Sequence, residues 1–281
     1  MPQENDHAAT NEVCLEDLIL PGTPKSVADA YRSLADRART ARFGLLEDDV
    51  VVLDTETTGL SFKDCELIEI SAARLSGREV VERFETFVDP GRPIPPEIQK
   101  LTGISQVDVA GAPSPKEAVA ALAEFVGGAP VLAHNATFDR TFVEAVPGGA
   151  NVSDIWIDTL SLSRIALPRL SSHRLADMAS AFGCAAVTHN SSDDVDALCG
   201  MWRIILCALT DLPAGLLGYL AGMHEEIDWA FRPVLSGLAL ADEGVRFSLP
   251  AVRARIVAAQ QGHVREDAQE LDGPVRAPSC E

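Results

Sequence analysis

The sequence predicts an α/β domain in which a mixed sheet is flanked by helices. Residues 50–53 form an apolar, β-branched run, which is typical of a buried central strand. Strands over residues 68–75 and 80–88 follow it and are joined by a turn at Ser76-Gly77, so the domain begins with a three-stranded meander. Further along the chain, short apolar runs alternate with helical patterns, which indicates additional strands covered by helices.

The other elements of this domain follow from caps, prolines and apolar spacing. Prolines between residues 90 and 96 indicate a rigid loop. Ser114 is a candidate N-cap for the helix that follows it. We expect helices over residues 97–101, 115–126, 136–146, 159–166, 174–182 and 192–209, and short strands over residues 130–133 and 155–158.

Segments with weaker patterns flank the domain on both sides. Residues 1–22 are expected to form a mobile leader, and residues 24–42 show the spacing of a helix that either packs on the domain or binds a partner. Residues 214–229 and 249–261 are compatible with helices, and the acidic residues 265–281 are expected to be disordered. We therefore expect a leader and helix over residues 1–45, a central domain over 46–212, and a helical extension with an acidic tail over 213–281.

The composition is that of a globular protein with a strong acidic excess. The 281 residues carry a formal net charge of −19, and the isoelectric point is about 4.6. Such a balance argues against a sequence-independent nucleic-acid binder, which normally presents a basic face. It allows an enzyme that meets nucleic acid only at a cleft where bound cations supply the positive charge.

Cysteine usage and the N-terminus indicate the cellular compartment. The six cysteines include no C-x-x-C pair and no cysteine–histidine ladder, so we expect reduced thiols. The polar N-terminus lacks the features of a secretory signal, and the longest apolar run is far shorter than the ~20 residues that a bilayer requires. We expect a cytoplasmic protein with no membrane partner.

Three short segments carry residues suited to metal chemistry, and the first is D-T-E at residues 54–56, at the end of the predicted central strand. Alternation along a strand places Asp54 and Glu56 on one face and Thr55 on the other. Two buried carboxylates on one face repel each other unless a hard divalent cation binds them. This pair therefore predicts a metal site; the alternative is a solvated pair on an edge strand.

The two other segments lie further along the chain. H-N-A-T-F-D, residues 134–139, places Asp139 about one turn into a helix, where its carboxylate would face the ligand-binding end of an open α/β sheet. H-N-S-S-D-D, residues 189–194, places His189 before a helix whose N-cap is expected at Ser191 or Ser192. The spacing does not choose a metal ligand among the nearby acids, which are Asp193, Asp194 and Asp196.

These segments resemble the DEDD exonuclease superfamily, His subtype, and are similar to the proofreading epsilon subunits of bacterial DNA polymerase III. The resemblance extends from about residue 49 to residue 209. It rests on D-T-E-T-T-G-L (54–60), P-P-E-I-Q-K-L-T-G-I-S (95–105), A-H-N-A-T-F-D (133–139), residues 158–183 and H-N-S-S-D-D (189–194). It implies a ribonuclease H-like fold, with a 3′–5′ exonuclease domain over residues 46–212.

The resemblance also assigns roles to the site residues. The metal ligands of the family match Asp54, Glu56, Asp139 and Asp194, which would bind two Mg²⁺ or Mn²⁺ ions, and its general base matches His189. Histidine suits that role because its side chain changes charge between about pH 5 and 8. The implied reaction is hydrolysis from a 3′ end by an activated water molecule, which releases a nucleoside 5′-monophosphate.

Residues around these motifs are expected to contact the substrate. The turn after D-T-E would hold the terminal nucleotide, with Leu60 against its base, although a role in forming the turn is equally compatible. Phe138 forms an apolar stripe with Phe142, which favours the core over base stacking, and Asn135 is equally a candidate N-cap. In epsilon subunits a histidine stands in place of Thr102. The expected contacts are Thr55, Thr57, Thr58, Gly59, Leu60, Glu97, Thr102, His134, Asn135 and Phe138.

The resemblance therefore implies an exonuclease that acts on single-stranded or frayed DNA 3′ ends in replication proofreading or repair. The alternatives are an exoribonuclease that trims RNA and a non-catalytic module that binds a polymerase or nucleic acid. The C-terminal part also resembles exonuclease domains fused to DinG-type helicases, although the sequence contains no Walker-type G-x-x-x-x-G-K-[ST] motif. The implied partners are a nucleic acid with a free 3′ end and a polymerase or helicase.

Overall fold

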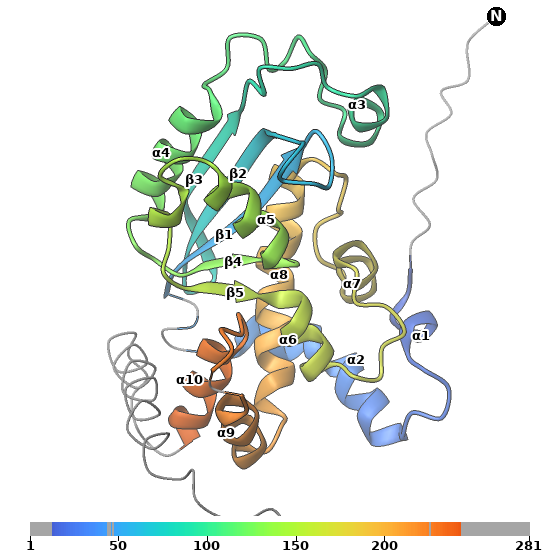
Figure 1. Cartoon of the computed structure of the whole chain (residues 1–281). Helices are drawn as coiled ribbons and strands as arrows, with labels where there is room; N and C mark the ends of the chain where they lie inside the picture. The colour runs from blue at the N-terminus through green and yellow to red at the C-terminus, as the bar shows by residue number, and fades with distance from the viewer. Residues whose placement is uncertain (1–12, 44–45, 47, 225, 243–281) are drawn as a thin grey trace, which may run out of the picture. The chain divides into compact units, whose positions relative to one another are not determined.

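The computed structural model describes residues 13–43, 46, 48–224 and 226–242. The chain divides into two compact units, Met1–Pro213 and Ala214–Glu281. A five-stranded mixed sheet forms the centre of the first unit, with the strand order β3-β2-β1-β4-β5 (Figure 1). The predicted α/β architecture, a mixed sheet flanked by helices, is confirmed.

The sheet combines a meander with two parallel strands. β1 (Asp48–Thr57), β2 (Leu67–Ser76) and β3 (Glu79–Phe87) pair antiparallel. β4 (Val131–Ala133) lies parallel to β1, and β5 (Trp156–Asp158) lies parallel to β4. β1 is therefore the middle strand, as its apolar run predicts.

Both faces of β1 are covered by helices. Val51 and Leu53 are buried in one core with residues of α4 (Pro115–Val126) and α5 (Ala136–Ala145). The long helix α8 (Ser191–Thr210) packs against β1 and β2 from the other side (Figure 1). The sheet thus separates α4 and α5 from α8, and successive residues of β1 face the two layers in turn.

Most helices begin where local signals predict. Ser114 and Glu117 form a reciprocal capping box at the start of α4. α3 (Pro96–Thr102), α6 (Thr159–Ala166) and α7 (Leu175–Phe182) agree closely with their predicted ranges. Within the described residues no single helix is long and apolar enough to cross a membrane; one bent pair, residues 191–210 with 215–222, meets the length and composition criteria together.

The segment before α2 is held on the first unit. α1 (Leu15–Leu18) was not predicted, and after it Ile19 forms a β-bridge with Leu170. The amide of Leu20 donates to the carbonyl of Arg169, and the amide of Ser171 donates to the carbonyl of Leu18. The expectation of a mobile leader is therefore wrong for residues 13–22, because backbone groups of this segment pair with those of residues 169–171. Residues 1–12 lie outside the described part of the chain.

α2 (Lys25–Thr40) packs on α8. Tyr31 and Leu34 on its inner face are buried. The Arg203 guanidinium on α8 donates to the carbonyl of Ala38 at 2.7 Å and to that of Ala41 at 2.8 Å, near the C-terminal end of α2. The interpretation of this helix as part of the domain is thus supported.

The second unit contains α9 (Ala214–Gly222) and α10 (Arg232–Asp242) within its described residues, and these helices pack against each other. The predicted helix over residues 214–229 is too long. The chain turns after Gly222, and the Arg232 guanidinium binds carbonyl groups of this turn, including those of Met223 and Ile227. α10 was not predicted. The predicted helix over 249–261 and the tail over 265–281 lie outside the described residues.

Replacing Leu34 on α2 should destabilise the first unit. We expect Leu34→Ala to lower the free energy of unfolding by about 2–5 kcal/mol, because it removes a fully buried side chain and leaves a cavity. Urea unfolding followed by circular dichroism measures the change. The control is Asp36→Ala on the exposed side of the same helix, with an expected change within about 0.5 kcal/mol. Equally small effects of both variants would show that α2 contributes no packing to the domain.

Candidate active site

The end of β1 presents the D-T-E motif to both layers of helices. Asp54 and Glu56 point toward the α8 side, and Thr55 points toward the α5 side. The buried hydroxyl group of Thr55 donates a hydrogen bond of 2.8 Å to Asp139 on α5. One residue of the motif therefore positions a carboxylate of the opposite layer.

Asp139 reaches the strand from the first turn of α5. The residue before this helix, Asn135, has a left-handed backbone with φ of 72°, which asparagine tolerates better than most side chains. Asn135 is the N-cap residue of α5, as expected, but its side chain makes no capping hydrogen bond. Asp139 itself is only 3% exposed.

A second aspartate, Asp158, supplies the missing cap. Its carboxylate accepts hydrogen bonds from the amides of Asn135 at 2.9 Å and Ala136 at 3.2 Å, at the start of α5. It also accepts the amides of Leu160 and Ser161, at the start of α6. One buried carboxylate thus caps two helices and fixes the turn that leads to Asp139. The sequence offered a signal for only one of these roles, an aspartate directly before a predicted helix.

The third segment folds into a loop that precedes α8. His189 is exposed and has a left-handed backbone with φ of 60°. The N-cap of α8 is Asn190, whose side chain accepts the amides of Ser192 and Asp193. The predicted N-cap at Ser191 or Ser192 is therefore wrong by one or two residues, because the asparagine side chain reaches these amides first.

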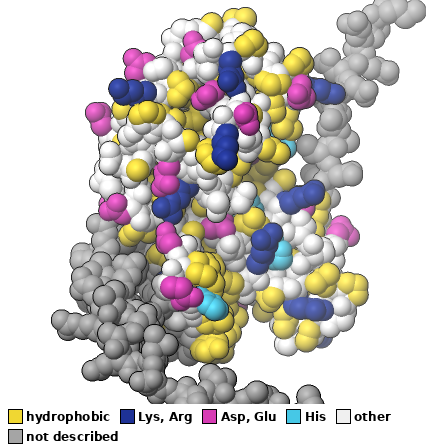
Figure 2. Space-filling model, viewed as in Figure 1, with side chains coloured by type: hydrophobic (Ala, Val, Ile, Leu, Met, Phe, Trp, Pro, Cys, Tyr) yellow, Lys and Arg dark blue, Asp and Glu magenta, His cyan; other side chains and the backbone are white. Residues whose placement is uncertain are grey.

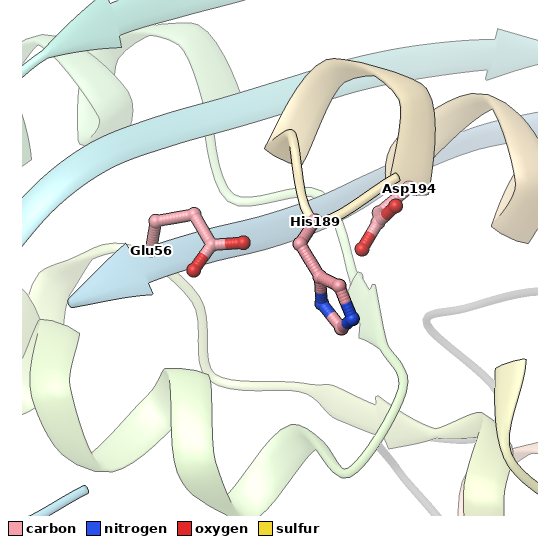
Figure 3. A group of neighbouring side chains, drawn as sticks. All are labelled: Glu56, His189 and Asp194. Carbon is pink, nitrogen blue, oxygen red and sulfur yellow. The ribbon is translucent and has the colours of Figure 1, made fainter. Parts of the chain in front are cut away.

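Glu56, His189 and Asp194 converge at the end of the sheet. Their potential ligand atoms all lie within 4.8 Å of one another. Figure 3 shows Glu56 on β1 and the two other side chains at the start of α8, directed toward the same space. Of the three acids among which spacing does not choose, Asp194 is the one in this group. Asp196 forms an ion pair with Arg83, and Asp193 accepts a hydrogen bond from Thr188.

The site concentrates buried carboxyl groups. Burial raises the pKa of Asp54 well above its ordinary value, and the charges of Asp139, Asp194, Glu56 and Glu69 raise it further. Burial, followed by the charges of Asp194, Glu69 and Asp139, raises the pKa of Glu56 to about 8. Burial likewise raises the pKa of Asp139 to about 7, against the opposing effect of the Thr55 hydrogen bond. These groups therefore repel one another when they are ionised.

Asp194 lies in the same environment, but neighbouring residues in the sequence, Thr188 and His189, also affect its carboxyl group. Burial raises the pKa of its carboxyl group, and the hydrogen bond from the Thr188 amide and the proximity of His189 act in the opposite direction. The Thr188 amide donates to Asp194 at 3.1 Å, which closes the loop that carries His189. The loop that carries His189 is therefore anchored to Asp194 through its backbone.

Glu69 is a further carboxylate that the sequence did not single out. It lies on β2 directly opposite Glu56 in the antiparallel register and is 7% exposed. The available signal was an acidic residue inside an otherwise apolar strand, L-I-E-I at residues 67–70. Acidic groups that are buried together are stable as anions only near positive charge.

This donor set fits hard divalent cations. Carboxylate oxygens, with one histidine beside them, are ligands that Mg²⁺ and Mn²⁺ accept. Binding of a cation would favour the ionised form of Asp54, Glu56 and Asp139, against the burial that raises their pKa values and the repulsion that adds to it at Asp54 and Glu56. The arrangement is therefore a candidate divalent-metal site.

The turn after β1 is hydrogen-bonded to the residue that precedes β2. The amide of Thr58 donates to the carbonyl of Glu66 at 2.8 Å, and the Thr58 hydroxyl accepts the amide of Glu66 at 2.9 Å. The Thr57 hydroxyl donates to the carbonyl of Gly59 at 2.7 Å. A Cβ atom on Gly59 would lie 2.8 Å from the Cys65 sulfur, so a side chain here would force the Cys65 side chain to move. Leu60 extends from this turn with 89% of its surface exposed.

Several other residues that are expected to contact the substrate make contacts within the protein. The Thr102 hydroxyl donates to the carbonyl of Ile98, while Glu97 on the same helix is exposed. The His134 ring contacts the Thr159 hydroxyl at 3.0 Å and the carbonyl of His173 at 2.9 Å. Phe138 packs against Phe142, with ring centroids 4.9 Å apart. Contacts of these residues with a substrate stay predictions.

The sequence matches one protein family over more than half of its length. Residues 51–201 match the family described as Exonuclease (RNase_T). The DNA polymerase III PolC-type of Caldanaerobacter subterraneus subsp. tengcongensis is 41% identical over 194 residues, which cover 67% of this chain and 14% of that polymerase. The PolC-type polymerase of Halalkalibacterium halodurans is 35% identical over 170 residues, which cover 59% of this chain and 12% of the polymerase. The chain thus spans a small part of the length of these relatives.

A solved structure shares the fold. The crystal structure of E. coli Exonuclease I in complex with a dA16 oligonucleotide has a TM-score of 0.50 and 18% sequence identity, and the alignment covers 63% of this chain and 43% of that chain. At this level of identity the likeness concerns the arrangement of helices and strands. The expected ribonuclease H-like fold is confirmed.

The metal-free protein should lose stability as the pH rises from about 5 to about 8. Glu56 and Asp139, with pKa values of about 8 and about 7, hold protons in the folded state that unfolded carboxyl groups have already released. The stability linked to these protons is present below this window and is lost as they dissociate. We expect the Tm in EDTA, measured by calorimetry, to fall by about 4 °C or more across the window.

Two comparisons separate this effect from the general charge of the protein. Glu56→Gln removes one of the titrating groups, so its Tm should fall less steeply over the same pH range. Mg²⁺ should raise the Tm more at pH 8 than at pH 5, because ionised carboxylates bind the cation. An identical pH profile in the wild type and in Glu56→Gln would contradict the assignment.

Proposed function

Because the chain belongs to the exonuclease family, we propose that it is a 3′–5′ exonuclease that uses two Mg²⁺ or Mn²⁺ ions. Its substrates would be single-stranded or frayed DNA 3′ ends, and its products nucleoside 5′-monophosphates. The observation that carries this proposal is the convergence of Glu56, His189 and Asp194 beside Asp54 and the buried Asp139. These residues come from three segments that are distant in the sequence.

The four acidic side chains would hold the cations. Asp54 and Glu56 offer oxygen atoms from β1, and Asp139 and Asp194 offer them from the first turns of α5 and α8. When bound, the ions would supply a water molecule of lowered pKa and would offset the negative charge of the scissile phosphate. Thr55 would act through its hydrogen bond to Asp139, which holds one oxygen of that carboxylate in place.

His189 would accept the proton of the attacking water. Its ring lies within 4.8 Å of the ligand atoms of Glu56 and Asp194, and its exposed position gives the proton a route to solvent. The left-handed backbone at His189 and the closed loop from Thr188 to Asp194 hold the imidazole over the carboxylates. A general base placed in this way contributes roughly 10²- to 10⁴-fold to the rate.

The turn after β1 would receive the terminal nucleotide. Its backbone is fixed by the hydrogen bonds between Thr58 and Glu66, so its polar groups are preorganised for a ligand. Leu60 would pack against the terminal base, since its side chain is exposed directly beside this turn. An unpaired end is favoured because a base must leave its stack to reach such a position.

DNA is preferred to RNA in this proposal because the relatives with 41% and 35% identity are named as DNA polymerases. A role in replication proofreading or repair, a polymerase or helicase partner and a cytoplasmic location belong to the same proposal. An exoribonuclease remains the second candidate within the same chemistry. A non-catalytic binding module is disfavoured, because all five proposed metal and base residues are present in the sequence.

A panel of oligonucleotides tests the substrate and the direction of hydrolysis. Single-stranded DNA, a duplex with a mismatched 3′ end and RNA, each labelled at the 3′ or the 5′ end, are incubated with Mg²⁺ or Mn²⁺. We expect release of labelled mononucleotide from the 3′ end of DNA, fastest for the unpaired ends, and none in EDTA. Preferential degradation of RNA would support the exoribonuclease, and retention of the label on every substrate would support the non-catalytic module.

Neighbouring aspartates provide a matched pair of variants. Asp194→Asn should lower kcat at least about 100-fold, because it removes an ionised oxygen from the candidate metal site. Asp193→Asn should leave kcat within about threefold, since this exposed side chain lies outside the cluster. Steady-state release of nucleotide measures both. Equal activities of the two variants would rule out the assignment of Asp194.

A further inference from the structure

Glu69 occupies an unusual position next to the candidate site. Its partner across the antiparallel β1–β2 pair is Glu56, one of the three converging residues. The glutamate is 7% exposed, and its charge is among the causes that raise the pKa values of Asp54 and Glu56. A carboxylate that adds repulsion to a crowded site requires a compensating role.

The contact of Glu69 with α8 indicates that role. Its Oε2 atom accepts the amide of Ser191, the first residue of α8, at 3.2 Å. The Ser191 hydroxyl donates to the hydroxyl of Ser71, two residues further along β2, at 2.6 Å. Both serines are essentially inaccessible to solvent. β2 therefore binds Ser191, the first residue of α8, through both its backbone amide and its side-chain hydroxyl.

This contact satisfies one of the helix amides that have no partner within the helix. Asn190 accepts the next two amides, those of Ser192 and Asp193. The first amide of α8 is thus capped by Glu69 on the sheet, and the next two are capped by Asn190 in the loop. A buried amide that loses its acceptor costs free energy, so this hydrogen bond can fix the position of the helix end.

The helix end that Glu69 contacts carries two residues of the candidate site. His189 lies two residues before Ser191, and Asp194 lies three residues after it. Because Glu69 stands opposite Glu56 in the sheet register, the same hydrogen bond fixes both residues relative to Glu56. Glu69 does not belong to the cluster of possible metal ligands found among the described residues, which consists of Glu56, His189 and Asp194.

We propose that Glu69 is a positioning residue, which docks the start of α8 on β2 so that His189 and Asp194 meet Glu56. The effect on activity rests on the proposed function, whereas the docking of the helix does not. The hydrogen bond, and not the negative charge of Glu69, carries this role. Two conservative substitutions separate these contributions. Glu69→Gln keeps the length and an acceptor oxygen without the charge, and Glu69→Asp keeps the charge on a side chain too short to reach the Ser191 amide.

The first measurement is hydrogen exchange of the Ser191 amide by NMR in metal-free protein. We expect this amide to exchange roughly tenfold faster in Glu69→Asp than in the wild type, because it loses its acceptor, and to stay protected in Glu69→Gln. The control is Glu79→Asp, at the exposed far end of the β2–β3 pair, which should leave the exchange unchanged. The Tm of each variant shows whether it has folded.

The second measurement is kcat for release of nucleotide from 3′-labelled single-stranded DNA. We expect a decrease of about 10- to 100-fold in Glu69→Asp, a KM within about twofold of the wild type, and recovery of most of kcat in Glu69→Gln. A folded Glu69→Gln that is as inactive as Glu69→Asp would overturn the proposal in favour of a role for the charge. So would unchanged exchange of Ser191 in Glu69→Asp.

The two measurements also separate this inference from the proposed function. If the wild-type protein releases no nucleotide from any substrate of the panel, the exonuclease proposal fails. The exchange of Ser191 in the three variants still decides whether Glu69 docks the helix. If the wild type is active and the exchange pattern is as expected but kcat is the same in all variants, Glu69 holds the helix without positioning the site.

Discussion

The crowding of buried carboxyl groups at the end of β1 is the constraint on which the rest of the structure depends. Burial raises the pKa values of all four site acids, and the charges of Asp139 and Asp194 raise those of Asp54 and Glu56 further, so the folded chain must hold together groups that repel. A short flexible motif would relax by moving these groups apart. A rigid sheet with helices on both faces prevents that movement, and the repulsion that remains is what a bound divalent cation would relieve in the proposed function.

The two helical layers share this task. Alternation along β1 directs Asp54 and Glu56 to α8 and Thr55 to α5, so a single tripeptide contacts both layers. Asp139 and Asp194 each lie in the first turn of a helix, where the positive end of the helix dipole stabilises an acidic side chain. Asp158 and Glu69 then fix these helix ends from the neighbouring strands, β5 and β2.

The sequence predicts features that depend on neighbouring residues better than those that depend on distant ones. Strands β1 to β3 and helices such as α4 follow from apolar runs and from caps like Ser114. α1 does not, because the residues that follow it pair with a distant loop at residues 169–171. The roles of Asp158 and Glu69 cannot be predicted from the residues next to them in the sequence, because each accepts backbone amides of another segment. Selection of Asp194 over Asp196 depends on Arg83, more than a hundred residues earlier in the chain.

The attachment of residues 13–40 to the first unit has a consequence for any shortened version of this protein. The family match covers residues 51–201, but α2 lies outside that range and covers part of α8. A fragment cut at those limits would lose α2 together with its partners Arg203 and Asp211, which lie beyond residue 201. It would also leave apolar surface of α8 open to self-association. The minimal autonomous fragment for crystallisation or reconstitution should therefore retain residues 13–213.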